Sequence, residues 1–175
     1  MRQDEKKTAD IIKSTTLCYI ENNGSWLMLY RNRKPDDPNE GKWIGIGGKI
    51  EDGESPDECN MREVLEETGL ILNSQEFRGV IKFRATTYED EDMYLYTSSE
   101  FTPADADAAV RFAETGEYEP PICSEGLLRW VAKDELLDLP MWEGDKAFIQ
   151  KLLDGAESVS MTLQYTGENC KIIED

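Results

Sequence analysis

The most informative stretch of the chain places acidic side chains and one arginine at fixed spacing. Residues 48–70 read GKIEDGESPDECNMREVLEETGL: Glu54 follows Gly48 after five residues, and Arg62-Glu63 come after seven more, ahead of Glu66-Glu67. Carboxylate oxygens are ligands that suit Mg²⁺, with Mn²⁺ as the alternative, and such ions also bind substrate phosphates. Bound there, they would offset phosphate charge and lower the pKa of an attacking water.

These carboxylates need a helix to bring them together, and residues 56–68 are predicted to form it. Ser55 suits an N-cap, Pro56 the first helical position and Glu58 a capping box, while Gly69 suits the stop. At about 100° per residue, three glutamates share one quadrant: Glu63, Glu66 and Glu67. The opposite side is expected to pack against the core and carries Met61, Val64, Leu65 and Thr68.

Like charges three and four residues apart destabilise a helix, so a fold that gathers them needs a compensating cation. The alternative is a solvated acidic face, since the chain has 37 acidic residues. The preceding Gly48 and Glu54, and Arg62 inside the segment, favour the metal site. An ion pair between Arg62 and Glu58 is the simpler alternative for that arginine.

The complete pattern over 48–70 resembles the signature of the Nudix hydrolases, with every position present. The resemblance implies an α/β (α+β) Nudix fold, an α/β/α sandwich around a mixed sheet, and a magnesium-dependent enzyme that cuts a diphosphate linkage in a nucleoside-diphosphate derivative. It implies metal binding by the Gly48 carbonyl and by Glu63, Glu66 and Glu67. Arg62 and Glu54 are implied to orient the other carboxylates.

Bulk composition excludes several classes of function. The formal net charge is −18, which argues against a nucleic-acid backbone or an anionic membrane as partner. The chain has no His, so a histidine base, triad or metal ligand is excluded. Its four cysteines form no CxxC pair, which favours reduced thiols in a cytoplasmic protein. A monomer or homodimer is expected.

Length and pattern indicate one domain over residues 14–175, preceded by a loose lead-in over 1–13. Hydrophobic alternation predicts strands at 15–20, 26–30, 43–46, 77–87, 93–97, 127–131 and, as the last, 158–165. Residues 88–92 should form an acidic turn, and 102–121 an elaborated surface loop with at most a short helix. A helical turn at 133–137 and a second main helix at 144–153 complete the chain.

We call residues 48–70 the Nudix box. The segments outside it resemble the MutT-like triphosphatases that act on oxidised purine nucleotides, including the 8-oxo-dGTP diphosphatases. The stretches that carry this resemblance are 41–49, 125–131 and 139–145. It implies that Trp142 stacks on the base and Asp145 hydrogen-bonds it. Gly144 stands where the group has a second Asp, and Ile44 where it has a base-reading Asn, so base recognition must differ in detail.

Other residues are candidates for the substrate site, each with a simpler alternative. Arg31 aligns with a phosphate-binding residue, but a solvated strand end explains it equally well. Phe83 is placed in the base pocket, and core packing is its alternative, as it is for Trp142. Asp90 or a neighbour could assist the metals, although a solvated hairpin turn accounts for it.

The function expected from these residues is hydrolysis of an oxidised purine nucleoside triphosphate to the monophosphate and pyrophosphate, which would cleanse the nucleotide pool. One alternative is another Nudix substrate, such as ADP-ribose or a dinucleoside polyphosphate, because Tyr88 stands about where hydrolases of the latter carry a Tyr. The other is a non-catalytic Nudix-fold sensor, which would be expected to lose glutamates that this chain keeps.

Overall fold

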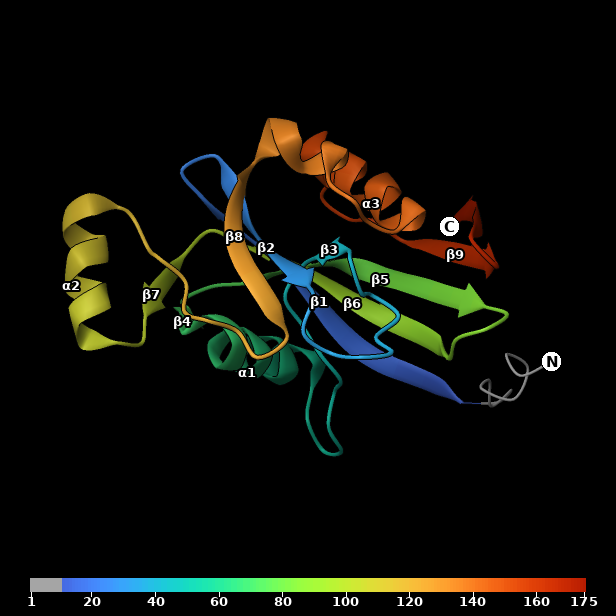
Figure 1. Cartoon of the computed structure of the whole chain (residues 1–175), viewed down its shortest axis with the longest axis horizontal. Helices are drawn as coiled ribbons and strands as arrows, with labels where there is room; N and C mark the ends of the chain where they lie inside the picture. The colour runs from blue at the N-terminus through green and yellow to red at the C-terminus, as the bar shows by residue number, and fades with distance from the viewer. Residues whose placement is uncertain (1–10) are drawn as a thin grey trace.

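A computed structural model describes residues 11–175 of the chain (Figure 1). Its helices are α1 (Pro56–Thr68), α2 (Ala106–Thr115), α3 (Glu143–Leu153) and the 3₁₀ helix η2 (Lys133–Asp138). Its strands are β1 (Ile12–Asn22), β2 (Ser25–Arg31), β3 (Trp43–Ile44), β4 (Leu70–Leu72), β5 (Glu76–Ala85), β6 (Asp90–Ser98), β7 (Phe101–Pro103), β8 (Gly126–Ala132), β9 (Met161–Thr166) and β10 (Asn169–Glu174).

Within this part of the chain, the main sheet has eight strands in the order β10-β9-β5-β6-β1-β2-β3, with β8 paired to β2 outside that path. The β1–β6 and β5–β9 pairs are parallel and the remaining pairs are antiparallel, so the sheet is mixed. The short β4 and β7 pair separately. Helix α1 lies on one side of the sheet and α3 on the other, the expected sandwich (Figure 1).

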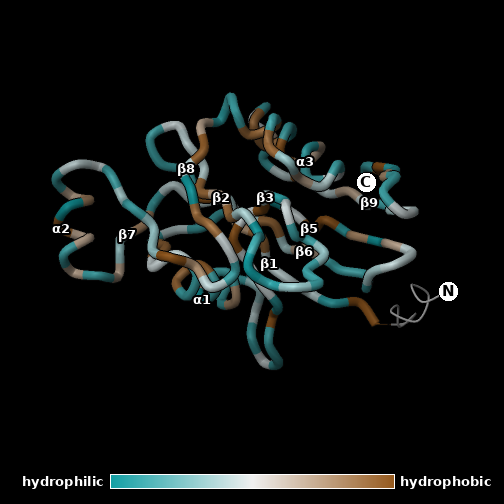
Figure 2. The backbone as a smooth tube through the Cα atoms, viewed as in Figure 1, coloured by the Kyte–Doolittle hydropathy of each residue, from teal (hydrophilic) through white to brown (hydrophobic). Residues whose placement is uncertain are grey.

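Alternation along the central strands fills a core on each face of the sheet. In β1, Leu17 and Tyr19 join the core that contains Phe148 of α3, whereas Cys18 and Ile20 join the core that contains Val64 of α1. This is the two-residue period of a strand buried on both faces. Figure 2 shows the hydrophobic stretches gathered along these strands between α1 and α3.

The first helix has the predicted bounds and caps. Glu58 N donates to Ser55 Oγ at 3.1 Å, and Ser55 N donates to Glu58 Oε1 at 2.9 Å, which is the predicted capping box. Gly69 ends the helix in the left-handed region, with φ 75°.

The predicted packing face of α1 is wrong in part. Met61 and Leu65 remain 45% and 42% exposed, while the buried residues are Cys59, Asn60, Val64 and Thr68. The inward face is therefore rotated toward Glu63 and Glu67, both of which are partly buried. Two of the three glutamates consequently face the protein, and Glu66 faces solvent. Helical spacing defines the faces of a helix, but the sheet beneath it decides which face is buried.

Several strand boundaries also differ from the prediction. Residues 12 and 13 belong to β1 rather than to a lead-in, and positions 1–10 lie outside the described residues. Residues 90–92 of the predicted acidic turn already belong to β6, because Asp92 pairs with Lys82 in the ladder. The last strand is β10, an exposed partner of β9 that lacks a clear burial pattern.

The segment predicted as a surface loop over 102–121 is more regular than expected. Phe101–Pro103 forms β7, and α2 runs over Ala106–Thr115 with Asp105 as its N-cap. No residue of α2 is buried, and it extends away from the sheet (Figure 1). Its C-terminal Gly116 carbonyl accepts hydrogen bonds from the Asn22 and Asn23 amides, each at 2.9 Å. These bonds fasten α2 to the β1–β2 turn.

Candidate active site

Arg62 is the centre of an ion-pair network on α1. Its guanidinium forms a bidentate pair with Glu54, in which Nε donates to Oε2 at 2.6 Å and Nη2 donates to Oε1 at 2.9 Å. The third nitrogen, Nη1, donates to Glu63 Oε1 at 2.9 Å and to Glu66 Oε2 at 3.3 Å. The hydrogen bond from Arg62 lowers the pKa of Glu54 to about 2. Glu58 is engaged in the capping box, so the alternative Arg62–Glu58 pair does not form. The bidentate geometry fixes the carboxylates that surround the arginine.

Glu63 lies directly against Gly48, at the point where the chain enters the box. A Cβ on Gly48 would lie 2.5 Å from the Glu63 carboxyl carbon, so a side chain there would displace that carboxylate. The Gly48 carbonyl accepts a hydrogen bond from Thr16 N at 2.9 Å, which pins this turn to β1. The Cys59 thiol is a second, weak donor to the same oxygen at 3.8 Å, which a stronger ligand could replace.

Glu67 is the most deeply buried of the acidic side chains in the box. Burial, a hydrogen bond with Glu125 and the charges of Glu125 and Glu63 raise the pKa of Glu67 well above its ordinary value. Its Oε2 atom is buried and has no hydrogen-bond partner among residues 11–175. Burial also raises the pKa of Glu63. Carboxyls gathered this closely away from water require either protons or cations.

The donor set fits a hard divalent cation. Glu63, Glu67 and Glu125 supply buried or partly buried carboxyl oxygens, Glu66 an exposed one and Gly48 a carbonyl. Oxygen ligands of this kind suit Mg²⁺ or Mn²⁺, and the partnerless Glu67 Oε2 is a ready ligand atom. In the described part of the chain, no three Cys, Asp or Glu side chains already form a compact metal cage. Arg62 spans Glu63 and Glu66 in this arrangement.

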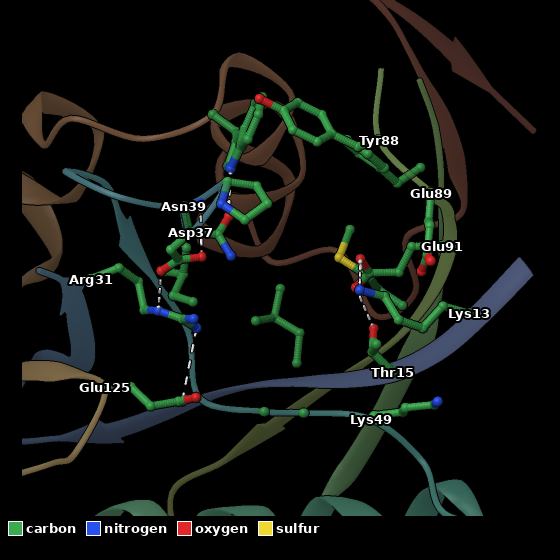
Figure 3. A pocket seen from close by; sticks show the side chains of 18 of the residues that line it. Lys13, Thr15, Arg31, Asp37, Asn39, Lys49, Tyr88, Glu89, Glu91 and Glu125 are labelled. Carbon is green, nitrogen blue, oxygen red and sulfur yellow. Dashed lines mark hydrogen bonds and ion pairs between the residues drawn. The ribbon is translucent and has the colours of Figure 1, made fainter. Parts of the chain in front are cut away.

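A cavity of about 700 Å³ adjoins this cluster through Gly48 and Glu125, whereas Glu63, Glu66 and Glu67 are not among its lining residues (Figure 3). Gly48, Lys49 and Glu125 line it at the end next to the box, and Phe83, Tyr88, Trp142 and Asp145 line it elsewhere. Figure 3 shows Arg31, Asp37, Asn39 and Glu125 along one wall, facing Tyr88, Glu89 and Glu91 on the other. The fold thus joins a carboxylate cluster to an aromatic compartment.

Trp142 stands at the start of α3 and has an aromatic environment. Its ring meets those of Phe83, Tyr88 and Tyr165 edge to face, with centroids 5.9, 6.0 and 5.1 Å away. The Lys42 ammonium lies 4.5 Å from the ring centroid, a cation–π contact. The indole Nε1 donates to Asn39 Oδ1 at 2.7 Å. The ring is thereby fixed while remaining a wall of the cavity.

Asp145, in the first turn of α3, is 8% exposed and lines the same cavity. Burial and the charge of Glu91 raise its pKa to about 7, although Lys42 acts in the opposite direction. At neutral pH a large share of Asp145 therefore carries a proton, and its carboxyl can donate as well as accept a hydrogen bond.

Arg31 also lines the cavity, but its charge is already engaged. Its Nε donates to Asp37 Oδ2 at 2.8 Å, and Nη1 lies 3.8 Å from Glu125 Oε2. Lys34 Nζ adds a 2.9 Å bond to Glu125 Oε1. Lys49, beside Gly48, is exposed and has no ion-pair partner among the described residues.

Sequence reasoning missed Glu125, Asn39 and Glu91 as pocket residues. Glu125 begins the stretch 125–131 that carries part of the MutT-like resemblance, but the sequence assigned it no role in the site. Asn39 lies in a loop rich in Pro, Asp and Asn. Glu91 was assigned to a solvated turn, whereas it lines the cavity and accepts from Thr15 Oγ1 at 2.6 Å. Asp90 begins β6, and its Oδ1 accepts from Ala85 N at 3.4 Å.

All four cysteines are free, as expected for reduced thiols. No helix within residues 11–175 has the length and apolar character needed to cross a membrane.

Comparison with protein families gives one match that covers most of the chain: the NUDIX domain model matches residues 12–152. A Nudix hydrolase of Bacillus subtilis, YvcI, is 28% identical over 158 residues, which is 90% of this chain and 89% of that protein. The oxidized purine nucleoside triphosphate hydrolase of Danio rerio is 37% identical over 70 residues, covering 38% of this chain and 45% of that protein.

A putative 8-oxo-dGTP diphosphatase 3 of Mycobacterium tuberculosis is 27% identical over 141 residues, or 79% of this chain and 59% of that protein. Among solved structures, a MutT protein from Bacillus halodurans superposes with a TM-score of 0.73 at 26% identity, covering 92% of this chain and 97% of the other.

Proposed function

The chain belongs to the NUDIX domain family of hydrolases, which act on nucleoside-diphosphate-linked substrates, and on this premise we propose that it hydrolyses oxidised purine nucleoside triphosphates such as 8-oxo-dGTP. The products are the nucleoside monophosphate and pyrophosphate, and the biological result is removal of damaged precursors from the nucleotide pool. The activities named for the Danio rerio and Mycobacterium tuberculosis relatives support this choice of substrate.

The observation that carries the proposal is the continuity of the 700 Å³ cavity. The end formed by Gly48, Lys49 and Glu125 offers the Glu125 carboxylate and a free ammonium group, and the Glu63 carboxylate lies against Gly48. This end therefore suits metal-bound phosphates. The compartment formed by Phe83, Trp142 and Asp145 offers aromatic surface and a carboxyl that can carry a proton, which suits a purine. A nucleotide bound with its phosphates at the first end therefore places its base in the second.

Divalent cations held by the acidic cluster would offset the charge of the phosphate oxygens and activate the attacking water. The chain's own residues prepare the site for them. Arg62 holds Glu54 and Glu63 in place. Lys49 and Arg31 line the cavity and supply positive charge that could bind phosphate oxygens. Burial opposes the ionisation of Glu125, but its hydrogen bonds with Glu67 and Lys34 lower its pKa, so Glu125 is the carboxylate of this pair that can accept a proton from water.

The test is a substrate panel with purified protein and Mg²⁺, in which kcat/KM is measured for 8-oxo-dGTP, dGTP, dATP, a dinucleoside polyphosphate and ADP-ribose. We expect 8-oxo-dGTP to have the highest kcat/KM and to yield 8-oxo-dGMP and pyrophosphate. A preference for ADP-ribose, or orthophosphate as the first product, would refute the proposal. An Asp145→Asn variant in the same panel links the result to the pocket.

One observation favours a second candidate, hydrolysis of dinucleoside polyphosphates. Tyr88 lines the cavity and packs edge-on against Trp142, with ring centroids 6.0 Å apart, so it could hold a second base. The same panel decides between the two. A Tyr88→Ala variant that loses activity only on the dinucleoside substrate would favour this alternative.

A further inference from the structure

The side-chain amide of Asn39 has one orientation imposed on it by Trp142. The indole Nε1–H is only a donor, so the Asn39 atom that lies 2.7 Å from it must be the carbonyl oxygen. The amide nitrogen, Nδ2, therefore points away from the indole. Within residues 11–175, Nδ2 has no hydrogen-bond partner, and Asn39 lines the cavity. The pocket is thus provided with an uncharged N–H donor whose direction is fixed.

The backbone of Asn39 is fixed as well. Its N–H donates to Asp37 Oδ1 at 3.1 Å, and its carbonyl accepts from Lys42 N at 2.9 Å. Asp37 is itself held by Arg31 Nε at 2.8 Å, a pair in which both side chains are largely buried. The donor is therefore preorganised before any ligand arrives, which is what a recognition group requires.

Carboxyl groups lie elsewhere around the cavity. Glu91 is held by Thr15 Oγ1 at 2.6 Å and by Lys13 Nζ at 3.6 Å, and Asp145 also lines the cavity. Figure 3 shows Glu91 on the wall opposite Asn39. The cavity thus combines an amide donor on one wall with hydrogen-bond acceptors on another.

This arrangement of one donor and several acceptors would bind two kinds of purine differently. A 6-oxopurine such as guanine presents a carbonyl acceptor beside ring and exocyclic N–H donors. A 6-aminopurine such as adenine presents a donor at position 6, which would oppose the Asn39 amide and leave it unpaired. An unpaired buried polar group is costly, so such a mismatch gives strong discrimination.

We propose that Asn39 is a base-reading residue whose Nδ2 donates to the carbonyl oxygen of a 6-oxopurine and so selects guanine-type nucleotides against adenine-type nucleotides. This inference rests on the proposed function for the identity of the ligand as a purine nucleotide. Asn39 lies in the loop between β2 and β3, next to Trp142, and would join Trp142 and Asp145 as a residue that determines base specificity.

Asn39→Asp is the decisive variant, because a carboxylate still accepts from the Trp142 indole but has no N–H to offer. The measurements are kcat/KM for 8-oxo-dGTP, dGTP and dATP, and equilibrium dissociation constants for dGMP and dAMP followed by tryptophan fluorescence. We expect the dGTP-to-dATP ratio of kcat/KM to fall roughly 10-fold or more, through KM. Asn32→Asp, an exposed change in the same loop, controls for added negative charge.

Asn39→Ala separates base reading from support of Trp142. If Asn39 only positions the indole, Asn39→Ala should weaken the binding of all purine nucleotides equally. Asn39→Asp should then leave the dGTP-to-dATP ratio of kcat/KM within twofold of wild type. That pair of results would refute the inference. The dissociation constants for dGMP and dAMP can be measured whether or not the protein turns over a triphosphate. Wild-type protein that turns over no triphosphate overturns the proposed function alone, whereas wild-type protein that binds dGMP no better than dAMP overturns the role of Asn39.

Discussion

Glu67, near the end of α1, and Glu125, just before β8, share a hydrogen bond although they are far apart in the sequence. Two carboxyls can share such a bond only if one of them carries a proton, and burial favours the protonated form of Glu67. A divalent cation held by these carboxyls would favour their ionised forms. The charge state of this pair, which only the tertiary fold brings together, would then depend on metal.

Glu67→Gln should lower kcat by about 10² or more, because it removes a proposed metal ligand. The thermal midpoint in chelator should stay the same or rise, since a neutral amide replaces a buried carboxyl whose ionised form is disfavoured. Steady-state kinetics check the first statement, and thermal unfolding with and without Mg²⁺ checks the second. Glu135→Gln, at an exposed position in η2, is the matched control. Full activity of Glu67→Gln, or of wild-type protein in excess chelator, would eliminate the metal site.

Arg62→Lys should lower kcat roughly 10- to 100-fold and weaken Mg²⁺ binding, because an ammonium cannot reproduce the bidentate grip on Glu54 while also reaching Glu63. Magnesium titration followed by thermal shift gives a readout that does not require turnover. Arg111→Lys, exposed on α2, should behave as wild type. Unchanged Mg²⁺ affinity in Arg62→Lys would show that this arginine does not organise the ligands.

Hydrolysis in ¹⁸O-water should place the label in pyrophosphate, as expected for attack on the β-phosphorus by a MutT-like enzyme. Mass spectrometry of both products shows which of them carries the ¹⁸O label. Label in the nucleoside monophosphate would instead indicate attack on the α-phosphorus and require the triphosphate to bind in a different register along the cavity.

Trp142→Ala should raise KM for every purine nucleotide roughly 10-fold or more, since the ring provides stacking surface worth about 1–3 kcal/mol. Trp142→Phe keeps a ring but loses the bond to Asn39, so it should recover stacking and still lose base selectivity. Steady-state kinetics on 8-oxo-dGTP, dGTP and dATP measure both effects. An unchanged KM in Trp142→Ala would show that Trp142 serves only packing.

Asp145→Asn should chiefly lower the ratio of kcat/KM for 8-oxo-dGTP over dGTP. The oxidised base carries an N–H at N7 and a carbonyl at C8, and a carboxyl that can both donate and accept distinguishes that edge. Equal ratios in variant and wild type would mean that another group senses the oxidised edge.

The same variant should change the pH dependence of stability. Asp145 has a pKa of about 7 in the folded protein against 3.8 ordinarily. The folded state therefore holds this proton more tightly, and wild-type stability falls as pH rises from about 4 to 7. Relative to Asp145→Asn, wild-type protein should lose roughly 2–3 kcal/mol between pH 5 and pH 8. Parallel stability curves for the two proteins would contradict the burial of this carboxyl in solution.

The sequence by itself determined the elements that depend on neighbouring residues. The capping box of Ser55 and Glu58, the Gly69 stop and the spacing of Glu63, Glu66 and Glu67 all follow from short-range geometry, and α1 has the predicted bounds. Alternating apolar residues located most strands for the same reason. The family also followed from sequence, because its pattern lies within one continuous segment.

Only the tertiary structure decided which groups act together. The sheet selects the buried face of α1, so Glu67 turns inward while Met61 stays exposed. Glu125 reaches Glu67 because β8 pairs with β2, and Asn39 meets Trp142 because the loop before β3 crosses the start of α3. Contacts between residues far apart in the sequence depend on how the sheet closes and on where loops cross it, and no local spacing encodes either.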